Sequence, residues 1–324
     1  MNGLELARGY YEEYGRPMLE KEFADLLPYL AVGYVGSGSE RFGFDDEVSQ
    51  DHDFEPGFRV FLPGEDVVDR RQEFLLERAY AKLPKEYMGV RRPLLAPVGG
   101  ERNGIIRTAD FYRMAVGSPS GELSAEAWLS IPDSALAEAV NGEVFFDNYG
   151  EFTKIRKSLM NMPEDIRLKR LAGNLLIMAQ SGQYNYLRCI RHGEPEAAQL
   201  ACGEFVNAAM KVFFLLNRRY MPYYKWSFRA LRSLPEGEEL AERLGDILFS
   251  DHRACIGTED KALMKGEAER KSCIIEDIAE GIIGKLRDQG LTEAVCQDLE
   301  KHAYSVNDRI TDGEIRSMHI LAAV

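Results

Sequence analysis

A glycine-serine turn followed by paired aspartates is the part of this 324-residue sequence best suited to chemistry. The turn reads Gly36-Ser37-Gly38-Ser39, and Asp51-His52-Asp53 follows it. Because successive side chains of a strand point to opposite faces, we expect Asp51 and Asp53 to project together. Six acidic residues and no Lys or Arg occupy positions 45–55, and a hard divalent cation such as Mg²⁺ relieves such repulsion. The sequence therefore predicts a metal site at Asp51 and Asp53.

The turn itself is predicted to bind phosphate. Glycines let the backbone approach a ligand closely, and the free N–H groups of a turn that enters a helix favour phosphate. The predicted contacts are Gly36, Ser37, Gly38 and Ser39, with Arg41 beside them. Nucleotidyl transfer needs hydrogen-bond donors to phosphate next to metal ligands, because its barrier falls mainly through positioning and charge neutralisation.

A second candidate site is a basic and aromatic segment. Positions 211–232 hold six basic residues and no acidic ones, and Tyr220, Tyr223, Tyr224 and Trp226 lie among them. Aromatic faces can stack on a base, and cations can hold a triphosphate. We expect Tyr224 and Lys225 to contact the nucleotide, with Lys225 reaching its phosphates across a domain interface. The alternative is ordinary packing of aromatic residues with polar tips.

Apolar spacing predicts the elements that position these residues. Buried strands are expected at 30–36, 51–62 and 104–107, helices within 4–29, and a further helix over 67–83 capped by Asp66. From residue 151 onward helical periodicity dominates, including a helix over 292–306. The predicted fold class is α+β: a small mixed-sheet core over 1–150, followed by an all-helical bundle over 151–324.

Composition limits the partners. The formal net charge of −13 disfavours an extended nucleic-acid surface. Apolar runs stay well short of the roughly 18 residues of a membrane span, and the first residues lack a basic stretch followed by an apolar one. The five cysteines are widely spaced. These features predict a cytoplasmic protein without a long nucleic acid or a membrane as partner, and they leave the oligomeric state open.

The spacing of the turn and the aspartates resembles the signature of the DNA polymerase β nucleotidyltransferase superfamily. Gly38-Ser39 is followed by Gly43 and then by Asp51-His52-Asp53. In that family the serine contacts the nucleotide phosphates and the two aspartates hold Mg²⁺. The resemblance implies these roles for Ser39, Asp51 and Asp53, with two Mg²⁺ ions and a nucleoside triphosphate as donor. Gly36-Ser37 duplicates the dipeptide, so either serine can fill the role.

More widely, the chain is similar to a group of uncharacterised bacterial nucleotidyltransferase-like proteins with a helical C-terminal domain. The likeness covers most of residues 20–235, and its architecture is similar to that of the antibiotic nucleotidyltransferases. Its matching segments are Gly36–Ser39, Gly43–Glu47, Asp51–Asp53 and Arg219–Trp226. It implies transfer of a nucleoside monophosphate to a hydroxyl of an unidentified acceptor, a small molecule being favoured, in a cleft between the domains.

The sequence departs from the superfamily at the third carboxylate, which many members carry on a later strand. The corresponding segment, Gly104–Thr108, has no acidic residue, and Asp110 just beyond it is the substitute we predict. If nothing fills this role, the protein would bind nucleotide without turning it over. A non-catalytic nucleotide-binding or partner-binding module is therefore the alternative function.

Overall fold

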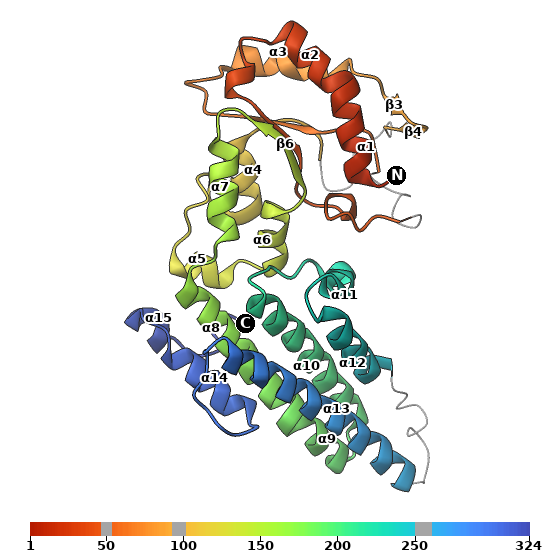
Figure 1. The fold of residues 1–324 in the computed structure, drawn as a ribbon, viewed down its shortest axis with the longest axis vertical. Coiled ribbons are helices and arrows are strands. Elements are labelled where there is room, and N and C mark those ends of the chain that lie inside the picture. Colours follow the sequence, from red (N-terminus) through yellow and green to blue (C-terminus); the bar gives the residue numbers. More distant parts are fainter. Residues whose placement is uncertain (47–53, 93–101, 250–260) are drawn as a thin grey trace. The chain divides into compact units, whose positions relative to one another are not determined.

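The computed structural model describes residues 1–46, 54–92, 102–249 and 261–324 (Figure 1). The chain divides into two compact units. Unit 1 consists of residues 1–123 and 131–161, and unit 2 of residues 124–130 and 162–324. Unit 1 contains a mixed sheet with helices and unit 2 is helical, so the predicted α+β class is confirmed. The domain boundary at residue 150 stays a prediction, and unit 1 extends beyond it to Asn161.

Unit 1 is built on a four-stranded sheet in the order β5-β2-β1-β6. Its strands are β1 (Ala31–Tyr34), β2 (Arg59–Leu62), β5 (Gly104–Arg107) and β6 (Glu143–Asp147). β1 is antiparallel to both β2 and β6, whereas β5 is parallel to β2. The C-terminal end of β1 therefore lies at the same edge of the sheet as the N-terminal ends of the other three strands. We call this edge the turn edge.

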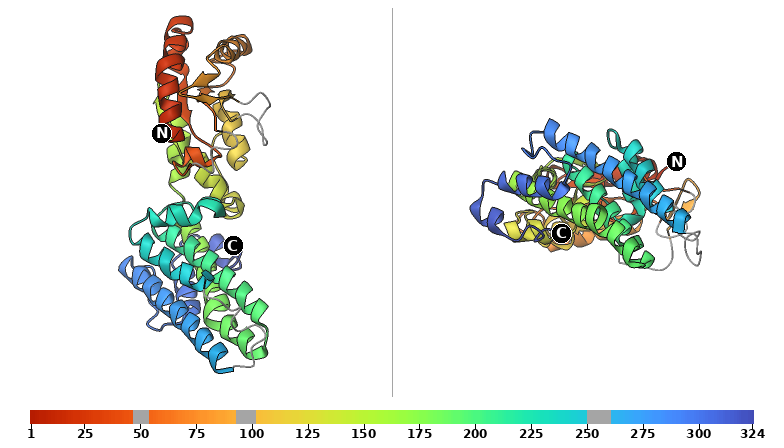
Figure 2. Two further views of the ribbon diagram at one scale, coloured as in Figure 1. Left: turned by 90° about the vertical axis from the view of Figure 1, so that its right-hand side faces the viewer. Right: turned by 90° about the horizontal axis from the view of Figure 1, so that it is seen from below.

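Helices cover both faces of the sheet (Figures 1 and 2). Because side chains alternate along a strand, Val60 and Leu62 of β2 enter the core shared with the N-terminal helices and α3, while Phe61 faces the other way. There its ring centroid lies 4.0 Å from that of Phe152 and 5.3 Å from that of Phe111. On the first face lie α1 (Gly3–Tyr10), the π-helical turn η1 (Tyr11–Gly15), α2 (Arg16–Glu22) and α3 (Arg70–Ala81). On the second face lie α4 (Thr108–Val116), α6 (Asp133–Val140) and α7 (Glu151–Met160).

The cap of α3 corrects one prediction. Asp69, not Asp66, precedes the first helical residue, and its carboxylate accepts the N–H of Gln72 at 2.8 Å. The Gln72 side chain in turn accepts the N–H of Asp69 at 2.8 Å, which completes a reciprocal capping box. The short elements of unit 1 are η2 (Leu27–Tyr29), η3 (Ser39–Arg41), β3 (Glu86–Tyr87) and β4 (Val90–Arg91).

Unit 2 is a helical bundle in which α10 packs along α8 and the π-helical segment η4 (Figure 2). Among the described residues, α10 is the one helix long and apolar enough to cross a membrane, but 61% of that window is buried inside the protein. It therefore has the burial of a core helix. The helices are α5 (Ala125–Ser130), α8 (Glu164–Met178), η4 (Ala179–Tyr186), α9 (Leu187–His192), α10 (Pro195–Leu216), α11 (Tyr224–Arg232), α12 (Gly237–Phe249), α13 (Lys261–Asp288), α14 (Leu299–Asp308) and α15 (Gly313–Ser317).

Buried cations of α8 attach distant segments to this bundle. The Nζ of Lys169, fully buried, donates to Asn307 Oδ1 at 2.9 Å and to the carbonyl oxygen of Met318 at 2.6 Å. Arg170 donates through Nη2 to the carbonyl oxygen of Trp128 at 2.7 Å. Because buried charges require such partners, Arg170 explains why α5 belongs to unit 2 although unit 1 surrounds it in sequence.

Candidate functional site: the Gly-Ser turn

The glycine-serine segment forms a turn at the turn edge, directly after β1. Gly36 has a φ of 107° and Gly38 a φ of 122°, a region that side chains rarely adopt. A Cβ at Gly38 would also lie 2.2 Å from Glu40 Oε1. The two glycines are thus required by the path of the backbone, which reverses after a fully buried strand.

The two serines of the turn have different environments. Ser37 is exposed, whereas Ser39 is 9% exposed at the start of η3. The carbonyl oxygen of Ser39 accepts the N–H of Phe42 at 3.1 Å and that of Phe44 at 2.9 Å. Ser37 is therefore the serine that the turn presents to a ligand from solvent. The spacing of Gly38-Ser39 and Gly43 in the sequence favours Ser39 and leaves both serines possible.

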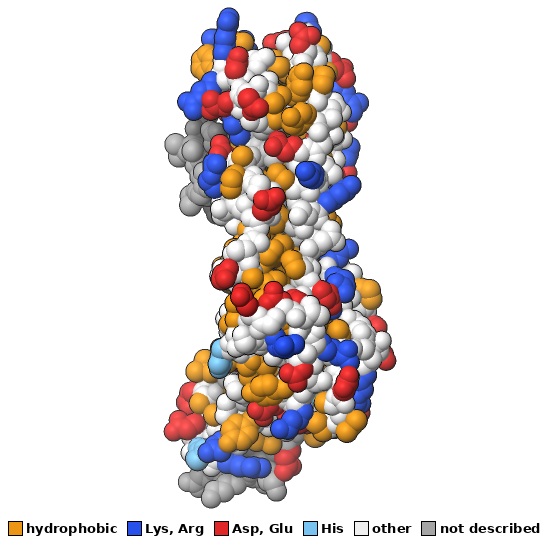
Figure 3. Space-filling view, turned by 90° about the vertical axis from the view of Figure 1, so that its left-hand side faces the viewer, with side chains coloured by type: hydrophobic (Ala, Val, Ile, Leu, Met, Phe, Trp, Pro, Cys, Tyr) orange, Lys and Arg blue, Asp and Glu red, His pale blue; other side chains and the backbone are white. Residues whose placement is uncertain are grey.

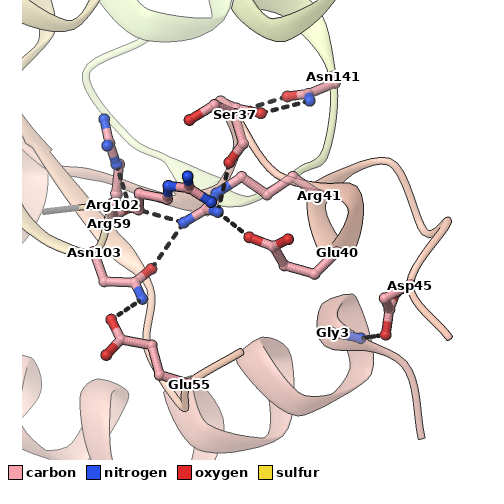
Figure 4. Close-up of polar contacts among 11 residues, drawn as sticks. Gly3, Ser37, Glu40, Arg41, Asp45, Glu55, Arg59, Arg102, Asn103 and Asn141 are labelled. Carbon is pink, nitrogen blue, oxygen red and sulfur yellow. Dashed lines mark hydrogen bonds and ion pairs between the residues drawn. The ribbon is translucent and has the colours of Figure 1, made fainter. Parts of the chain in front are cut away.

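Asn141 holds the start of the turn, a contact that the sequence gave no reason to expect. The N–H of Gly36 donates to Asn141 Oδ1 at 2.8 Å, and Asn141 Nδ2 donates to the carbonyl oxygen of Gly36 at 2.7 Å (Figure 4). Asn141 is 9% exposed and follows the last residue of α6. Both backbone groups of Gly36 are thereby satisfied by one side chain.

Arg41 supports the turn from within the protein. Its Nη1 donates to the carbonyl oxygen of Ser37 at 2.8 Å and forms an ion pair with Glu40, while its Nη2 donates to the carbonyl oxygen of Arg102 at 2.8 Å (Figure 4). The guanidinium lies over the Tyr34 ring, 4.3 Å from its centroid, and Arg41 is 1% exposed. Its hydrogen bonds go to groups of the protein itself. This geometry therefore does not support the predicted direct contact of Arg41 with nucleotide. Its charge remains close to the turn.

Three arginines gather at the turn edge. Arg59, the first residue of β2, donates through Nε to the carbonyl oxygen of Arg102 at 2.6 Å, the same oxygen that Arg41 uses. Burial, together with the positive charges of Arg41 and Arg102, lowers the pKa of Arg59 to about 10. Three positive charges thus lie close together at the turn edge of a chain whose net charge is −13.

Carboxylates border this cluster. Asn103 Nδ2 donates to Glu55 Oε1 at 2.7 Å, and Asn103 Oδ1 accepts from Arg41 Nη2 at 3.2 Å. Burial raises the pKa of Glu138 on α6, against the opposing effect of the Arg102 and Arg41 charges. Asp45 Oδ2 accepts the N–H of Gly3 at 2.9 Å, and its Oδ1 is buried without a hydrogen-bond partner among the described residues.

Asp51 and Asp53, the predicted metal ligands, lie in 47–53, outside the described residues. Over 1–46, 54–92, 102–249 and 261–324, no group of three or more His, Cys, Asp or Glu side chains could hold a metal ion. The donor chemistry next to residues 47–53 fits a hard cation, because Asp45 has a buried Oδ1 without a hydrogen-bond partner among the described residues. The chain that follows residues 47–53 reaches the turn edge at Arg59.

Asp110 lies in the first turn of α4, which begins where β5 ends, at the edge of the sheet opposite the turn edge. Its carboxylate is half-exposed and forms an ion pair with Arg113. The neighbouring Phe111 does reach the site, since Arg59 lies 5.4 Å from its ring centroid. These contacts give no support to Asp110 as a third carboxylate, and that role stays a prediction.

Tyr224 and Lys225 belong to unit 2, at the start of α11. Tyr224 is 73% exposed, and its ring centroid lies 4.4 Å from that of Tyr223. The Nζ of Lys225 lies 5.2 Å from the centroid of the Trp226 ring. The segment thus offers exposed aromatic rings next to a cation, and its contact with a nucleotide stays a prediction.

Unit 1 and unit 2 together define an α+β protein with a small mixed sheet and a helical C-terminal region, an architecture compatible with a nucleotidyltransferase-like fold. Residues 128–227 match the model of a family described as a domain of unknown function, DUF4037. The match includes Asn141 and ends within α11, and it does not include the Gly-Ser turn. No curated protein and no solved structure matches the chain.

Proposed function

We propose that the protein is a Mg²⁺-dependent nucleotidyltransferase that binds its nucleoside triphosphate at the Gly-Ser turn. The observation that carries this proposal is the exposed Ser37, between two glycines of positive φ, at the edge of the sheet where Arg41, Arg59 and Arg102 gather. The backbone N–H groups of a turn, a hydroxyl and nearby cations suit a polyphosphate. The aspartate pair precedes the strand that begins at this edge.

Each residue has a distinct role in this proposal. Ser37 donates its hydroxyl to a phosphate oxygen, and Arg59 and Arg102 stabilise the triphosphate through their charge. Asp51 and Asp53 would hold Mg²⁺, which when bound supplies neutralisation of the triphosphate charge. In the transfer step, an acceptor hydroxyl oxygen bonds to the α-phosphorus as the bond from that phosphorus to its bridging oxygen breaks. Pyrophosphate leaves with the electron pair, and the hydroxyl proton passes to solvent.

A small molecule is the favoured acceptor. A net charge of −13 disfavours the many phosphate contacts of a long nucleic acid. The face drawn in Figure 3 has acidic and basic side chains interspersed over both units, and a phosphate backbone needs clustered cations instead.

A non-catalytic nucleotide-binding or partner-binding module of the same fold is the second candidate function. It is favoured by β5, whose residues Gly104–Arg107 include no carboxylate although this strand is the parallel neighbour of β2. Such a protein would bind the triphosphate and release no pyrophosphate.

Calorimetric titration with α,β-methylene-ATP, with Mg²⁺ or with EDTA, tests the site. We expect Mg²⁺-dependent binding that Asp51→Asn with Asp53→Asn weakens at least about tenfold, the scale of lost contacts to a charged ligand. Glu22→Gln with Asp25→Asn, which removes two exposed carboxylates from unit 1, is the matched control and should bind normally. Pyrophosphate release from ATP with a metabolite extract as acceptor source then separates the enzyme from the non-catalytic module.

The two serines provide a sharper pair of variants for the same titration. Ser37→Ala should weaken binding about tenfold, whereas Ser39→Ala should leave the affinity nearly unchanged, because only Ser37 is exposed. Equal affinities in the wild type and the double aspartate variant would rule out the metal site. A loss confined to Ser39→Ala would contradict the orientation of the turn.

A further inference from the structure

We propose that Asn141 is a positioning residue for the nucleotide: by holding Gly36, it sets the direction of the Ser37 hydroxyl and N–H. This inference rests on the proposed function. Asn141 pairs with both the N–H and the carbonyl oxygen of Gly36, at 2.8 and 2.7 Å. A carboxamide offers a donor and an acceptor side by side, as a neighbouring strand would. It thereby continues the pairing of β1 beyond its last residue and fixes the peptide that leads into Ser37.

The backbone that carries Asn141 is itself anchored. Arg156 of α7 places Nη2 at 2.9 Å from the carbonyl oxygen of Val140 and at 3.0 Å from those of Asn141 and Gly142. These carbonyls lie at the C-terminus of α6, where helical partners are missing and a cation is favourable. Burial lowers the pKa of the Arg156 guanidinium, and Tyr112 acts in the opposite direction. These contacts fix the backbone position from which the side chain of Asn141 extends.

Close packing of Gly142 against the end of β1 also fixes the backbone position of Asn141. Gly142 has a φ of 65°, and a Cβ there would lie 2.0 Å from the carbonyl oxygen of Tyr34. The backbone of the Asn141-Gly142 pair thus lies directly against the end of the strand from which the turn emerges. The anchors from α7 and β1 leave Asn141 little freedom, so it can impose one conformation on Gly36.

The turn has a second support in Arg41. The effect of Asn141 on the orientation of the turn can therefore be measured apart from any effect on folding. Arg41 donates to the carbonyl oxygen of Ser37, a different group of the turn from those that Asn141 holds (Figure 4). Loss of the Asn141 contacts should therefore free the orientation of Gly36 and Ser37 while Arg41 keeps the turn in place. We therefore expect a larger loss in the free energy of nucleotide binding than in the free energy of unfolding.

Three variants test this inference. Asn141→Leu removes both contacts at similar volume and adds no charge, while Asn141→Asp keeps the acceptor for the Gly36 N–H and loses the donor. Asn148→Ala is the matched control, because Asn148 Nδ2 also donates to a distant carbonyl oxygen of unit 1, that of Leu27 at 2.9 Å, but is exposed. The readouts are hydrogen exchange of the Gly36 amide without nucleotide, the affinity for α,β-methylene-ATP with Mg²⁺, and the urea midpoint.

We expect the Gly36 amide to exchange at least about tenfold faster in Asn141→Leu and to stay protected in Asn141→Asp, a rescue that a general loss of structure would not give. The affinity should fall about tenfold in both variants and not in Asn148→Ala. Wild-type exchange and affinity in Asn141→Leu would overturn the inference, as would an equal loss in Asn148→Ala. A wild-type protein that does not bind the analogue refutes the proposed function and the nucleotide role of Asn141, and exchange then still shows whether Asn141 holds the turn.

Discussion

At the turn edge, the carboxylate of Glu138 has a pKa that its surroundings change. It lies on α6, and burial raises its pKa above the ordinary value although Arg102 and Arg41 act in the opposite direction. The energetic cost of burying the charged carboxylate is therefore larger than the stabilisation that these arginines give it. Glu138 should therefore make the stability of unit 1 depend on pH.

The sign of this dependence follows from the proton balance. A raised pKa means that the folded state binds the proton more tightly. The stabilising contribution of Glu138 is therefore complete below the unfolded pKa of about 4.3 and is lost as pH rises through the folded pKa. Glu138→Gln removes the ionisation, so its stability should fall less than that of the wild type as pH rises from about 4 through the folded pKa of Glu138. Urea unfolding followed by circular dichroism measures this, with Glu77→Gln on the exposed face of α3 as control. Parallel losses in the wild type and Glu138→Gln would contradict the role of burial.

At the residue level, the sequence identified the turn but did not show which of its two serines faces solvent. The glycines and serines were identifiable from their types and spacing, yet the exposure of Ser37 and the burial of Ser39 depend on where η3 begins. Asn141 could not be predicted, because it contacts Gly36 across 105 positions and no local pattern marks it. Such contacts arise from strand order, which the sequence of one segment does not contain.

Elements with a strong local signal were predicted well. The strand expected at 104–107 is β5, and that expected at 30–36 contains β1. The strand expected at 51–62 was wrong over 54–58, because β2 begins only at Arg59, and its residues 51–53 lie outside the described residues. The helix expected over 292–306 begins only at Leu299, because the preceding segment is fixed by tertiary contacts. Thr292 Oγ1 lies 2.8 Å from His302 Nδ1, and the N–H of Leu299 donates to Gln183 Oε1 at 2.9 Å. Partners of this kind override helical propensity and leave no trace in periodicity.

Two glycines inside helices of unit 2 should respond oppositely to the same substitution. A Cβ at Gly281 of α13 would meet nothing within 4 Å, whereas a Cβ at Gly173 of α8 would lie 2.8 Å from the carbonyl oxygen of Ile320. Gly281→Ala should therefore raise the free energy of unfolding by about 0.5–1 kcal/mol, the difference in helix propensity. Gly173→Ala should lower it, because backbone must move. Urea unfolding measures both, and stabilisation by Gly173→Ala would show that α8 and the C-terminal segment yield easily.

At the scale of the whole molecule, the two units have separate cores and separate reporters. The core of unit 1 includes Phe58, which is fully buried, and its ring centroid lies 5.0 Å from that of Tyr80 and 5.3 Å from that of Tyr11. Both tryptophans of the chain, Trp128 and Trp226, belong to unit 2. Tryptophan fluorescence therefore follows unit 2, while circular dichroism follows both units.

This separation predicts the outcome of weakening one core. Phe58→Ala should cost unit 1 about 3–5 kcal/mol, so that circular dichroism detects an earlier urea transition while the fluorescence midpoint stays that of the wild type. Phe205→Ala, at a fully buried position of α10, is the counterpart and should move the fluorescence midpoint. Two compact units unfold independently when few interactions couple them. A Phe58→Ala protein in which both signals shift together would mean that the units unfold as one cooperative body.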